Sequence, residues 1–141
     1  MSTTTATLRE TIDAYNAAWN AHDVAAIGSM HAPDMVFENH TAGERAEGDE
    51  ALEHIARIFD AWPDIEFSTR RLYVRDDLVV QEWTARATHV KPLSRGEITA
   101  EPSGRAVEWV GMDVIPFEEG KIKRKDVYSD SVSILRQVGL L

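Results

Sequence analysis

One carboxylate, Asp113, lies on the apolar face of a segment with a two-residue period, Arg105 to Phe117. The apolar positions that share this face are Val107, Trp109, Gly111, Ile115 and Phe117. A carboxylate among such neighbours and without a paired cation is costly to ionise, which suits a group that transfers protons. We therefore expect Asp113 to be buried or to face a cleft. The alternative is a core residue satisfied by a backbone amide or a tyrosine hydroxyl group.

Two histidines are further candidates for a general base near neutral pH. His40 directly follows Asn39 at the end of a predicted strand, although strand alternation points the two side chains to opposite faces. His89 ends the predicted strand Leu78 to Val90 and shares a face with Trp83, so it can reach the mouth of a pocket. The other histidines have no second ligand at metal-binding spacing and are interpreted as surface or capping residues: His22, His31 and His54.

Apolar residues at helical spacing predict helices in the first half of the chain. In order, these are a helix from near the N-terminus to about Asn20, a short helix capped by Asp23 and stopped by Pro33, and a helix that begins at Asp49 and ends before Pro63. Tyr15 and Trp19 share the buried face of the first helix, and Phe59 lies on that of the third.

The rest of the chain reads mostly as β-structure. The predicted strands are Met35 to His40, Ile65 to Arg75, Leu78 to Val90, Arg105 to Phe117 and Lys121 to Tyr128. Gly43 and Gly48 bracket a polar loop, Lys91 to Gly104 is a long connection, and the basic run Lys121 to Lys125 is interpreted as the solvated end of a strand. This order predicts an α+β fold, in which the helices cover one face of a curved, mixed or antiparallel sheet and enclose a pocket.

Composition limits the possible functions. The 141 residues suffice for one domain, 1–141, with a hydrophobic core. A net charge of -9 disfavours nucleic acid as a partner, and the absence of cysteine excludes disulfides and thiolate chemistry. No apolar run is long enough for a membrane span, and Met1 to Thr7 lacks the features of a signal peptide, so a cytoplasmic protein is expected. No nucleotide, zinc or calcium motif occurs, and we expect no bound metal.

Several short motifs follow one another in a fixed order. They are Ala-Tyr-Asn-Ala-Ala-Trp-Asn-Ala-His-Asp near the start, Trp62-Pro63-Asp64, Trp83-Thr84-Ala85-Arg86-Ala87-Thr88-His89, Pro102-Ser103-Gly104-Arg105, Gly120-Lys121-Ile122 and Leu135-Arg136-Gln137-Val138-Gly139. Together they resemble the SnoaL-like polyketide cyclases, a group within the nuclear-transport-factor-2-like superfamily, over nearly the whole chain. The resemblance implies a cone-shaped α+β fold, often dimeric, with a deep pocket and no obligatory cofactor.

The resemblance also suggests roles for single residues. Relative to the ketosteroid isomerases of this superfamily, Tyr15 falls on their oxyanion-hole tyrosine and Asp113 on their protonated, hydrogen-bond-donating aspartate. Their general-base aspartate falls on Asn39, which cannot take a proton from carbon but can bind a carbonyl group. The cyclases and the related limonene-epoxide hydrolases have a base in the last strand, and that position is Val127 here. Asp126 is adjacent, and a one-residue bulge would turn it into the pocket.

The leading hypothesis is a cofactor-independent enzyme that acts on a small hydrophobic carbonyl compound by acid–base chemistry, such as polyketide aldol cyclisation or an isomerisation through an enolate-like intermediate. Tyr15 and Asp113 would stabilise the oxyanion, and Asn39 would orient the substrate. The base stays open among Asp113, Asp126, His40 and His89. Residues expected to contact the substrate are Trp19, Phe37, Phe59, Trp109, Gly111 and Val127.

Two alternatives belong to other classes of function. The first is an epoxide hydrolase or dehydratase of the same fold, and the second is a non-catalytic module for small-ligand binding or dimerisation. Apolar residues opposite to the pocket face are Leu78, Val80, Val110, Met112 and Val114. Because exposed apolar faces often mark interfaces, they predict a homodimer through the open face of the sheet, unless Ser131 to Leu141 covers them.

Overall fold

The computed structural model describes residues 5–141, in an α+β arrangement that confirms the predicted fold class. The first half of the chain contains α1 (Thr5–Asn20), α2 (Val24–Ser29), β1 (His31–Asn39), β2 (Glu44–Glu47) and α3 (Asp49–Ala61). The second half contains β3 (Glu66–Arg75), β4 (Leu78–Thr88), β5 (Leu93–Arg95), β6 (Ile98–Ala100), β7 (Ala106–Glu118), β8 (Lys121–Ser129) and α4 (Ser131–Gln137).

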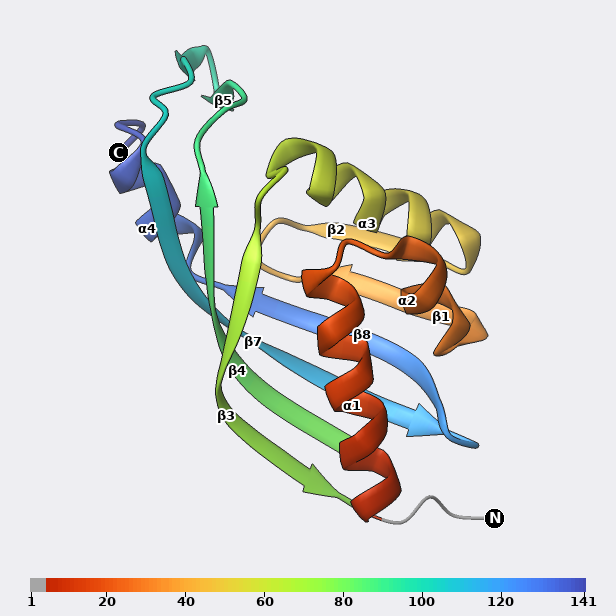
Figure 1. Cartoon of the computed structure of the whole chain (residues 1–141). Helices are drawn as coiled ribbons and strands as arrows, with labels where there is room; N and C mark the ends of the chain where they lie inside the picture. Colours follow the sequence, from red (N-terminus) through yellow and green to blue (C-terminus); the bar gives the residue numbers. More distant parts are fainter. Residues whose placement is uncertain (1–4) are drawn as a thin grey trace.

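Six strands form one curved, mixed sheet in the order β2-β1-β8-β7-β4-β3. Strands β1 and β8 pair in parallel, and all the other neighbours pair antiparallel. Figure 1 shows that α1, α2 and α3 all lie on one side of this sheet, with α1 crossing in front of the long strands. The buried apolar side chains of the helices and of the covered sheet face form the core.

Strand β7 shows the predicted alternation of burial, with Val107, Trp109 and Asp113 all turned inward. Gly111 pairs directly with Trp83 of β4. A Cβ atom at Gly111 would overlap the tip of the Trp83 indole ring. Glycine at this position therefore makes room for a large aromatic side chain on the covered face of the sheet.

Strand β8 contains a bulge that changes which side chains face inward. Val114 pairs with Asp126 and Phe117 pairs with Ile122, so β8 has one more residue than β7 between these two pairs. As a result, Ile122 and Lys125 are both buried although they are three residues apart. The strand does bulge, as we considered, but the bulge does not turn Asp126 toward the helices.

Two local expectations in the first half are wrong. The predicted loop after Gly43 is strand β2, which pairs with β1. Helix α2 ends at Ser29, before the predicted stop at Pro33, and Pro33 itself lies within β1. Proline is tolerated there because the regular pairing of β1 with β8 is interrupted between His31 and Val36, so the missing N–H removes no ladder bond.

The second half differs from expectation at its least periodic segments. The predicted connection 91–104 contains a small hairpin of β5 and β6. Helix α4 packs against β7, where the Gln137 amide bonds both the N–H and the C=O of Glu108, at 3.0 and 2.6 Å. Within residues 5–141, no helix combines the length and the apolar character needed to cross a membrane.

Candidate functional site

A cavity of about 520 Å³ is lined by side chains from the helices and from the covered face of the sheet. Its wall is mainly apolar and includes all four tryptophans of the chain: Trp19, Trp62, Trp83 and Trp109. The larger polar side chains on the wall are Asn16, Asn39, Glu44, His54, Arg57, Gln81, Asp113 and Lys125. An apolar chamber with a few convergent polar groups is typical of a small-molecule site.

Asp113 lies on this wall, as predicted, and is 2% exposed. Its Oδ2 atom accepts a hydrogen bond of 2.9 Å from Nε2 of Gln81. Gln81 is held in turn by Asn16 of α1, through reciprocal amide bonds of 2.8 and 3.1 Å. Within residues 5–141 the Oδ1 atom of Asp113 has no hydrogen-bond partner. The carboxylate is thus fixed in orientation, and one acceptor atom is left for a ligand.

Lys125 lies beside Asp113, although the sequence analysis assigned it to a solvated run. Its Nζ atom is 3.8 Å from Oδ2 of Asp113 and 3.7 Å from the centroid of the Trp19 ring. Burial lowers the pKa of Lys125 below its usual range, and the nearby carboxylate opposes this shift. The premise that Asp113 has no paired cation is therefore wrong. Asp113 and Lys125 form an ion pair that is buried between the sheet and the helices.

Tyr15 is fully buried but is not part of the cavity wall, where an oxyanion role would require it to be. Its hydroxyl group lies 2.9 Å from Nε2 of His31, which is not the surface residue we expected. Burial raises the pKa of Tyr15 far above its usual range. Burial, aided by the charge of Lys125, lowers the pKa of His31 to about 4. A neutral imidazole can accept a hydrogen bond from the Tyr15 hydroxyl group. An oxyanion role for Tyr15 stays a prediction.

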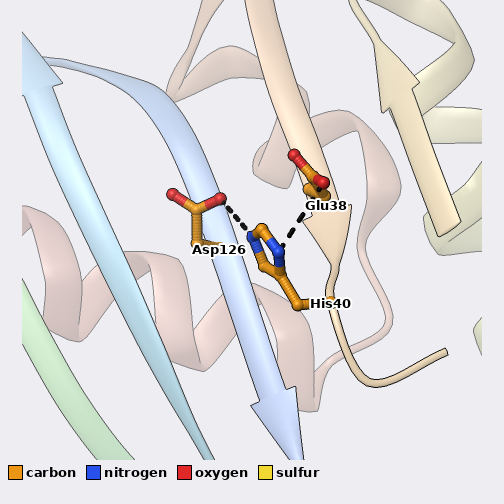
Figure 2. A group of neighbouring side chains, drawn as sticks. All are labelled: Glu38, His40 and Asp126. Carbon is orange, nitrogen blue, oxygen red and sulfur yellow. Dashed lines mark hydrogen bonds and ion pairs between the residues drawn. The ribbon is translucent and has the colours of Figure 1, made fainter. Parts of the chain in front are cut away.

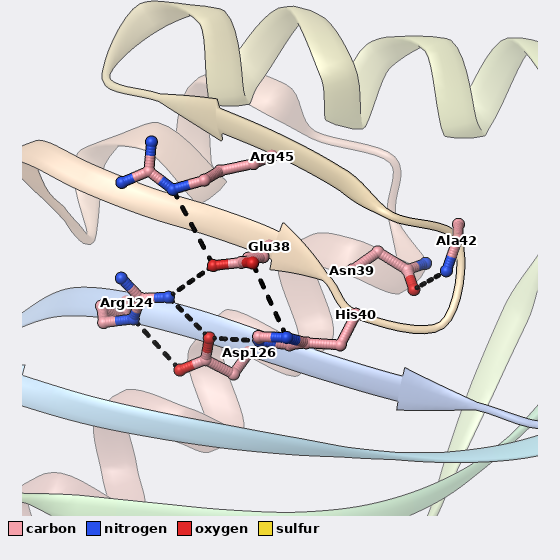
Figure 3. Close-up of polar contacts among 7 residues, drawn as sticks. All are labelled: Glu38, Asn39, His40, Ala42, Arg45, Arg124 and Asp126. Carbon is pink, nitrogen blue, oxygen red and sulfur yellow. Dashed lines mark hydrogen bonds and ion pairs between the residues drawn. The ribbon is translucent and has the colours of Figure 1, made fainter.

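Two polar residues lie on the cavity wall near α3. Asn39 lines the cavity, and its Oδ1 atom accepts a bond of 3.0 Å from the backbone N–H of Ala42 (Figure 3). His54 of α3 is buried against Phe37, with ring centroids 5.1 Å apart, and lies 4.0 Å from Glu44. Burial lowers the pKa of His54. The expectation that His54 lies on the surface is wrong, because it shares the inward face of α3.

His40 and Asp126 lie outside the cavity lining. Nε2 of His40 is 2.8 Å from Oδ1 of Asp126, as Figure 2 shows, and the imidazole ring stacks on Tyr128. Arg124 donates to both carboxylate oxygens of Asp126, at 3.1 and 2.7 Å, and to Glu38 at 2.9 Å (Figure 3). These bonds lower the pKa of Asp126, chiefly through Arg124. His40 and Asp126 are therefore bonded to each other on the outer face of the sheet and do not face the cavity.

The same cluster contains three potential metal ligands, which the sequence analysis did not foresee. Ligand atoms of Glu38, His40 and Asp126 lie within 4.8 Å of one another. The guanidinium group of Arg124 already bonds both carboxylates, so a cation would have to displace it or lie beside a like charge. The arrangement fits an ion-pair network better than a metal centre.

Three further predicted site residues lie behind the wall. His89 is 1% exposed, and its Nδ1 atom accepts a bond of 3.2 Å from the backbone N–H of Ser103. Phe59 packs edge-on against Trp19, and Gly111 is covered by the Trp83 ring. The predicted substrate contacts that do line the cavity are Trp19, Phe37, Trp109 and Val127. Their roles toward a ligand stay predictions.

Sequence reasoning missed the polar residues that surround Asp113. Gln81 and Lys125 had a usable signal, because each lies two residues from a position assigned to the inward face, Trp83 and Val127. No such signal marked Asn16. It follows Tyr15 on a helix, and its hydrogen-bond partner Gln81 lies 65 residues further along the chain.

A curved mixed sheet that is covered on one face by N-terminal helices, around a largely apolar cavity, defines a protein of the nuclear-transport-factor-2-like and ketosteroid-isomerase-like fold. Within this class, the chain belongs to the SnoaL-like polyketide cyclase family, whose profile matches residues 9–138. The resemblance inferred from the motifs is thereby confirmed. No curated protein is significantly similar to the chain in sequence.

Solved structures share the fold at low sequence identity. AclR from Streptomyces galilaeus, a candidate hydroxylase, is 22% identical, with a TM-score of 0.83 over 98% of this chain and 88% of that one. IdmH from Streptomyces antibioticus, a candidate polyketide cyclase, is 23% identical, with a TM-score of 0.80 over 94% and 98%. TerC, co-crystallised with polyporic acid, is 18% identical, with a TM-score of 0.77 over 94% and 98%. Similarity at this level establishes the fold and not the reaction.

Proposed function

We propose that this protein is a cofactor-independent enzyme that enolises a hydrophobic carbonyl compound in the cavity and so promotes aldol cyclisation or isomerisation of a polyketide-like molecule. The observation that carries the proposal is Asp113, a buried carboxylate with an unpaired oxygen atom on an aromatic cavity wall. Ionised Asp113 takes a proton from the carbon next to the carbonyl group. The resulting enolate carbon then attacks a second carbonyl group, or is reprotonated elsewhere.

Three contacts support Asp113 as the base among the four candidates. The ammonium group of Lys125 lies 3.8 Å from the carboxylate, and the bond from Gln81, which is backed by Asn16, holds the carboxylate in one orientation. The other candidates do not line the cavity. A base that is fixed by packing and hydrogen bonds loses little entropy on reaching the reactive geometry.

The cavity wall supports the substrate class. Its tryptophans offer flat apolar surfaces, and Asn39 presents an amide group that can orient a carbonyl oxygen. Membership of the SnoaL-like polyketide cyclase family points to the same class, as does TerC, a protein of this fold that was co-crystallised with polyporic acid.

The test measures proton exchange and does not require the natural substrate. The probe is 2-tetralone, a bicyclic ketone, and NMR follows the replacement of its α-protons by deuterium in D2O. Wild type is compared with Asp113→Asn, Asp113→Leu and Asp126→Asn. If Asp113 is the base, both Asp113 variants lose about 10²-fold or more of the exchange rate, since neither side chain accepts the proton. Asp126→Asn keeps the wild-type rate.

Other outcomes assign other functions. Retained exchange in Asp113→Asn together with loss in Asp113→Leu would make Asp113 a protonated donor instead of the base. Binding of 2-tetralone to the folded wild type without exchange above the buffer rate contradicts the enzyme hypothesis. The fold would then serve as a ligand-binding module.

We also propose that a second copy of the chain covers the outer face of the sheet. Leu78 and Val110 are each 39% exposed there, and Tyr128 lies on the same face. Apolar groups exposed on adjacent strands favour a self-complementary interface. Sedimentation at micromolar concentration should show a dimer, and Val110→Glu should give a folded monomer. A monomeric wild type contradicts this proposal.

A further inference from the structure

Lys125 presents a primary amine at the wall of an apolar cavity. We propose that this amine is a covalent site, at which an aldehyde or ketone that enters the cavity forms an iminium bond. The inference rests on the proposed function for its ligand class, carbonyl compounds. It does not depend on proton transfer from carbon to Asp113. The proposed function needs Asp113 as a base, whereas this inference needs Lys125 as a nucleophile.

The location of Lys125 separates it from the other lysines of the chain. Its side chain is 8% exposed and lines the cavity, because it lies two residues from Val127 on the inward face of β8. Lys121 donates to the carbonyl oxygen of Ser29, and both it and Lys91 are exposed. Lys123 is 57% exposed and pairs with Glu118. Among residues 5–141, Lys125 is therefore the amine that a carbonyl compound in the cavity meets.

The surroundings of Lys125 favour the neutral amine more than those of a surface lysine do. Burial lowers its pKa, and a desolvated lysine in an apolar pocket is an activated nucleophile. The titratable groups that face it are Asp113 on β7, Tyr15 on α1 and His31 on β1. Tyr15 and His31 are neutral at pH 7, because their pKa values are shifted upward and downward respectively. Asp113 is thus the group that exchanges a proton with the amine.

The step balances with Asp113 as the proton shuttle. The Asp113 carboxylate removes one proton from the Lys125 ammonium group, and the nitrogen lone pair attacks the carbonyl carbon. A proton then moves from nitrogen to the former carbonyl oxygen, which gives a neutral carbinolamine. Protonated Asp113 returns its proton to the hydroxyl group, water leaves, and the nitrogen lone pair forms the C=N bond. The net products are the iminium cation and one water molecule, with Asp113 again ionised.

The product cation fits the same pocket. The positive nitrogen stays over the face of Trp19, whose ring centroid is 3.7 Å from Nζ. It also stays near the carboxylate of Asp113, which balances its charge. An iminium makes the neighbouring C–H bonds more acidic, so the intermediate of the proposed reaction would be an enamine.

The experiment traps the iminium by reduction. The probe is 2-naphthaldehyde with sodium cyanoborohydride at pH 7, and peptide mass spectrometry locates each naphthylmethyl group. Lys125 should be modified at least about tenfold faster than each of the other three lysines, because the cavity holds the aldehyde beside this amine and burial enlarges its neutral fraction. Lys123→Met, a matched exposed control on the same strand, should leave this rate unchanged. Lys125→Arg keeps the charge and should abolish the cavity adduct.

The outcomes separate the two proposals. Modification of Lys125 no faster than of the exposed lysines, while tryptophan fluorescence shows that naphthaldehyde is bound, overturns the covalent site. If Lys125→Arg fails to fold, the comparison among the four lysines of the wild type still decides the question. An adduct at Lys125 without exchange of 2-tetralone supports the covalent site and contradicts the proposed function. Exchange of 2-tetralone without an adduct at Lys125 supports the proposed function and contradicts the covalent site.

Discussion

The buried pair of Asp113 and Lys125 allows a quantitative test of the charge state on which the proposed chemistry depends. The perturbations are Asp113→Asn, Lys125→Met and the two combined. Each single substitution leaves one buried charge without its partner, whereas the double variant removes both charges and preserves similar shapes. A double-mutant cycle therefore isolates the interaction between the two side chains.

The expected magnitude follows from the 3.8 Å separation of Nζ and Oδ2. Two unit charges at that distance attract by about 4 kcal/mol at an effective dielectric constant of about 20. Desolvation of both groups offsets much of this attraction, so breaking the pair from one side costs about 3 kcal/mol. The double variant should lose less than the sum of the single variants, with a coupling free energy of at least about 1.5 kcal/mol.

The assay is urea unfolding at pH 7, followed by tryptophan fluorescence. An exposed ion pair on the same two strands serves as the matched control. Nζ of Lys123 lies 3.3 Å from Oε2 of Glu118, closer than in the buried pair, but both side chains are more than half exposed. Its cycle, with Lys123→Met and Glu118→Gln, should give a coupling below about 0.5 kcal/mol because water screens the charges.

Additive effects at the buried pair would refute the reasoning. A coupling free energy below about 0.5 kcal/mol would mean that Asp113 and Lys125 are not ionised together in the folded protein. Asp113 would then have no charged partner in Lys125, and the ion pair on which the proposed chemistry depends would be absent. Equal couplings in the buried and exposed pairs would likewise show that burial does not strengthen the interaction.

Three further predictions concern packing, pH and metal. Gly111→Ala should lower the free energy of unfolding by about 1–3 kcal/mol, because its Cβ meets the Trp83 ring, and Trp83→Phe should recover part of this loss in urea unfolding. The pKa of His31 is lowered from 6.5 to about 4 on folding, so the unfolded chain binds more protons in that window, and stability should fall as the pH drops from 6.5 to 4. His31→Asn should flatten this acid limb, and an unchanged slope would contradict the assignment. Chelation with EDTA should change neither the melting temperature nor 2-tetralone exchange, and stoichiometric metal in elemental analysis would overturn this expectation.

The features predicted from sequence are those that a long, regular element specifies by itself. The thirteen residues of β7 alternate strictly, so the inward direction of Asp113 could be read from its neighbours. The short strands β2, β5 and β6 were missed because three or four residues carry too little periodicity, and pairing with a neighbouring strand defines them.

The site was harder to predict because burial and cavity exposure are different properties. Tyr15 and Trp19 lie on the same buried face of α1, yet Trp19 lines the cavity while Tyr15 bonds to His31. The apolar stripe of a helix identifies the covered face but not which part of it meets open space. Lys125 was missed because its basic neighbours suggested solvent, whereas its alternation with Val127 decides its direction.

The wall around Asp113 combines three features that cost stability. A buried ammonium group, a carboxylate oxygen without a partner and an open volume of about 520 Å³ are each unfavourable in a core whose purpose is packing alone. Replacing a buried ion pair by neutral groups of similar shape is often neutral or stabilising. The variant with both Asp113→Asn and Lys125→Met should therefore unfold closer to the wild-type urea midpoint than either single variant does, and yet lose 2-tetralone exchange. If it retains exchange, the pair has a structural role; if it is both inactive and unfolded, the cost argument is wrong.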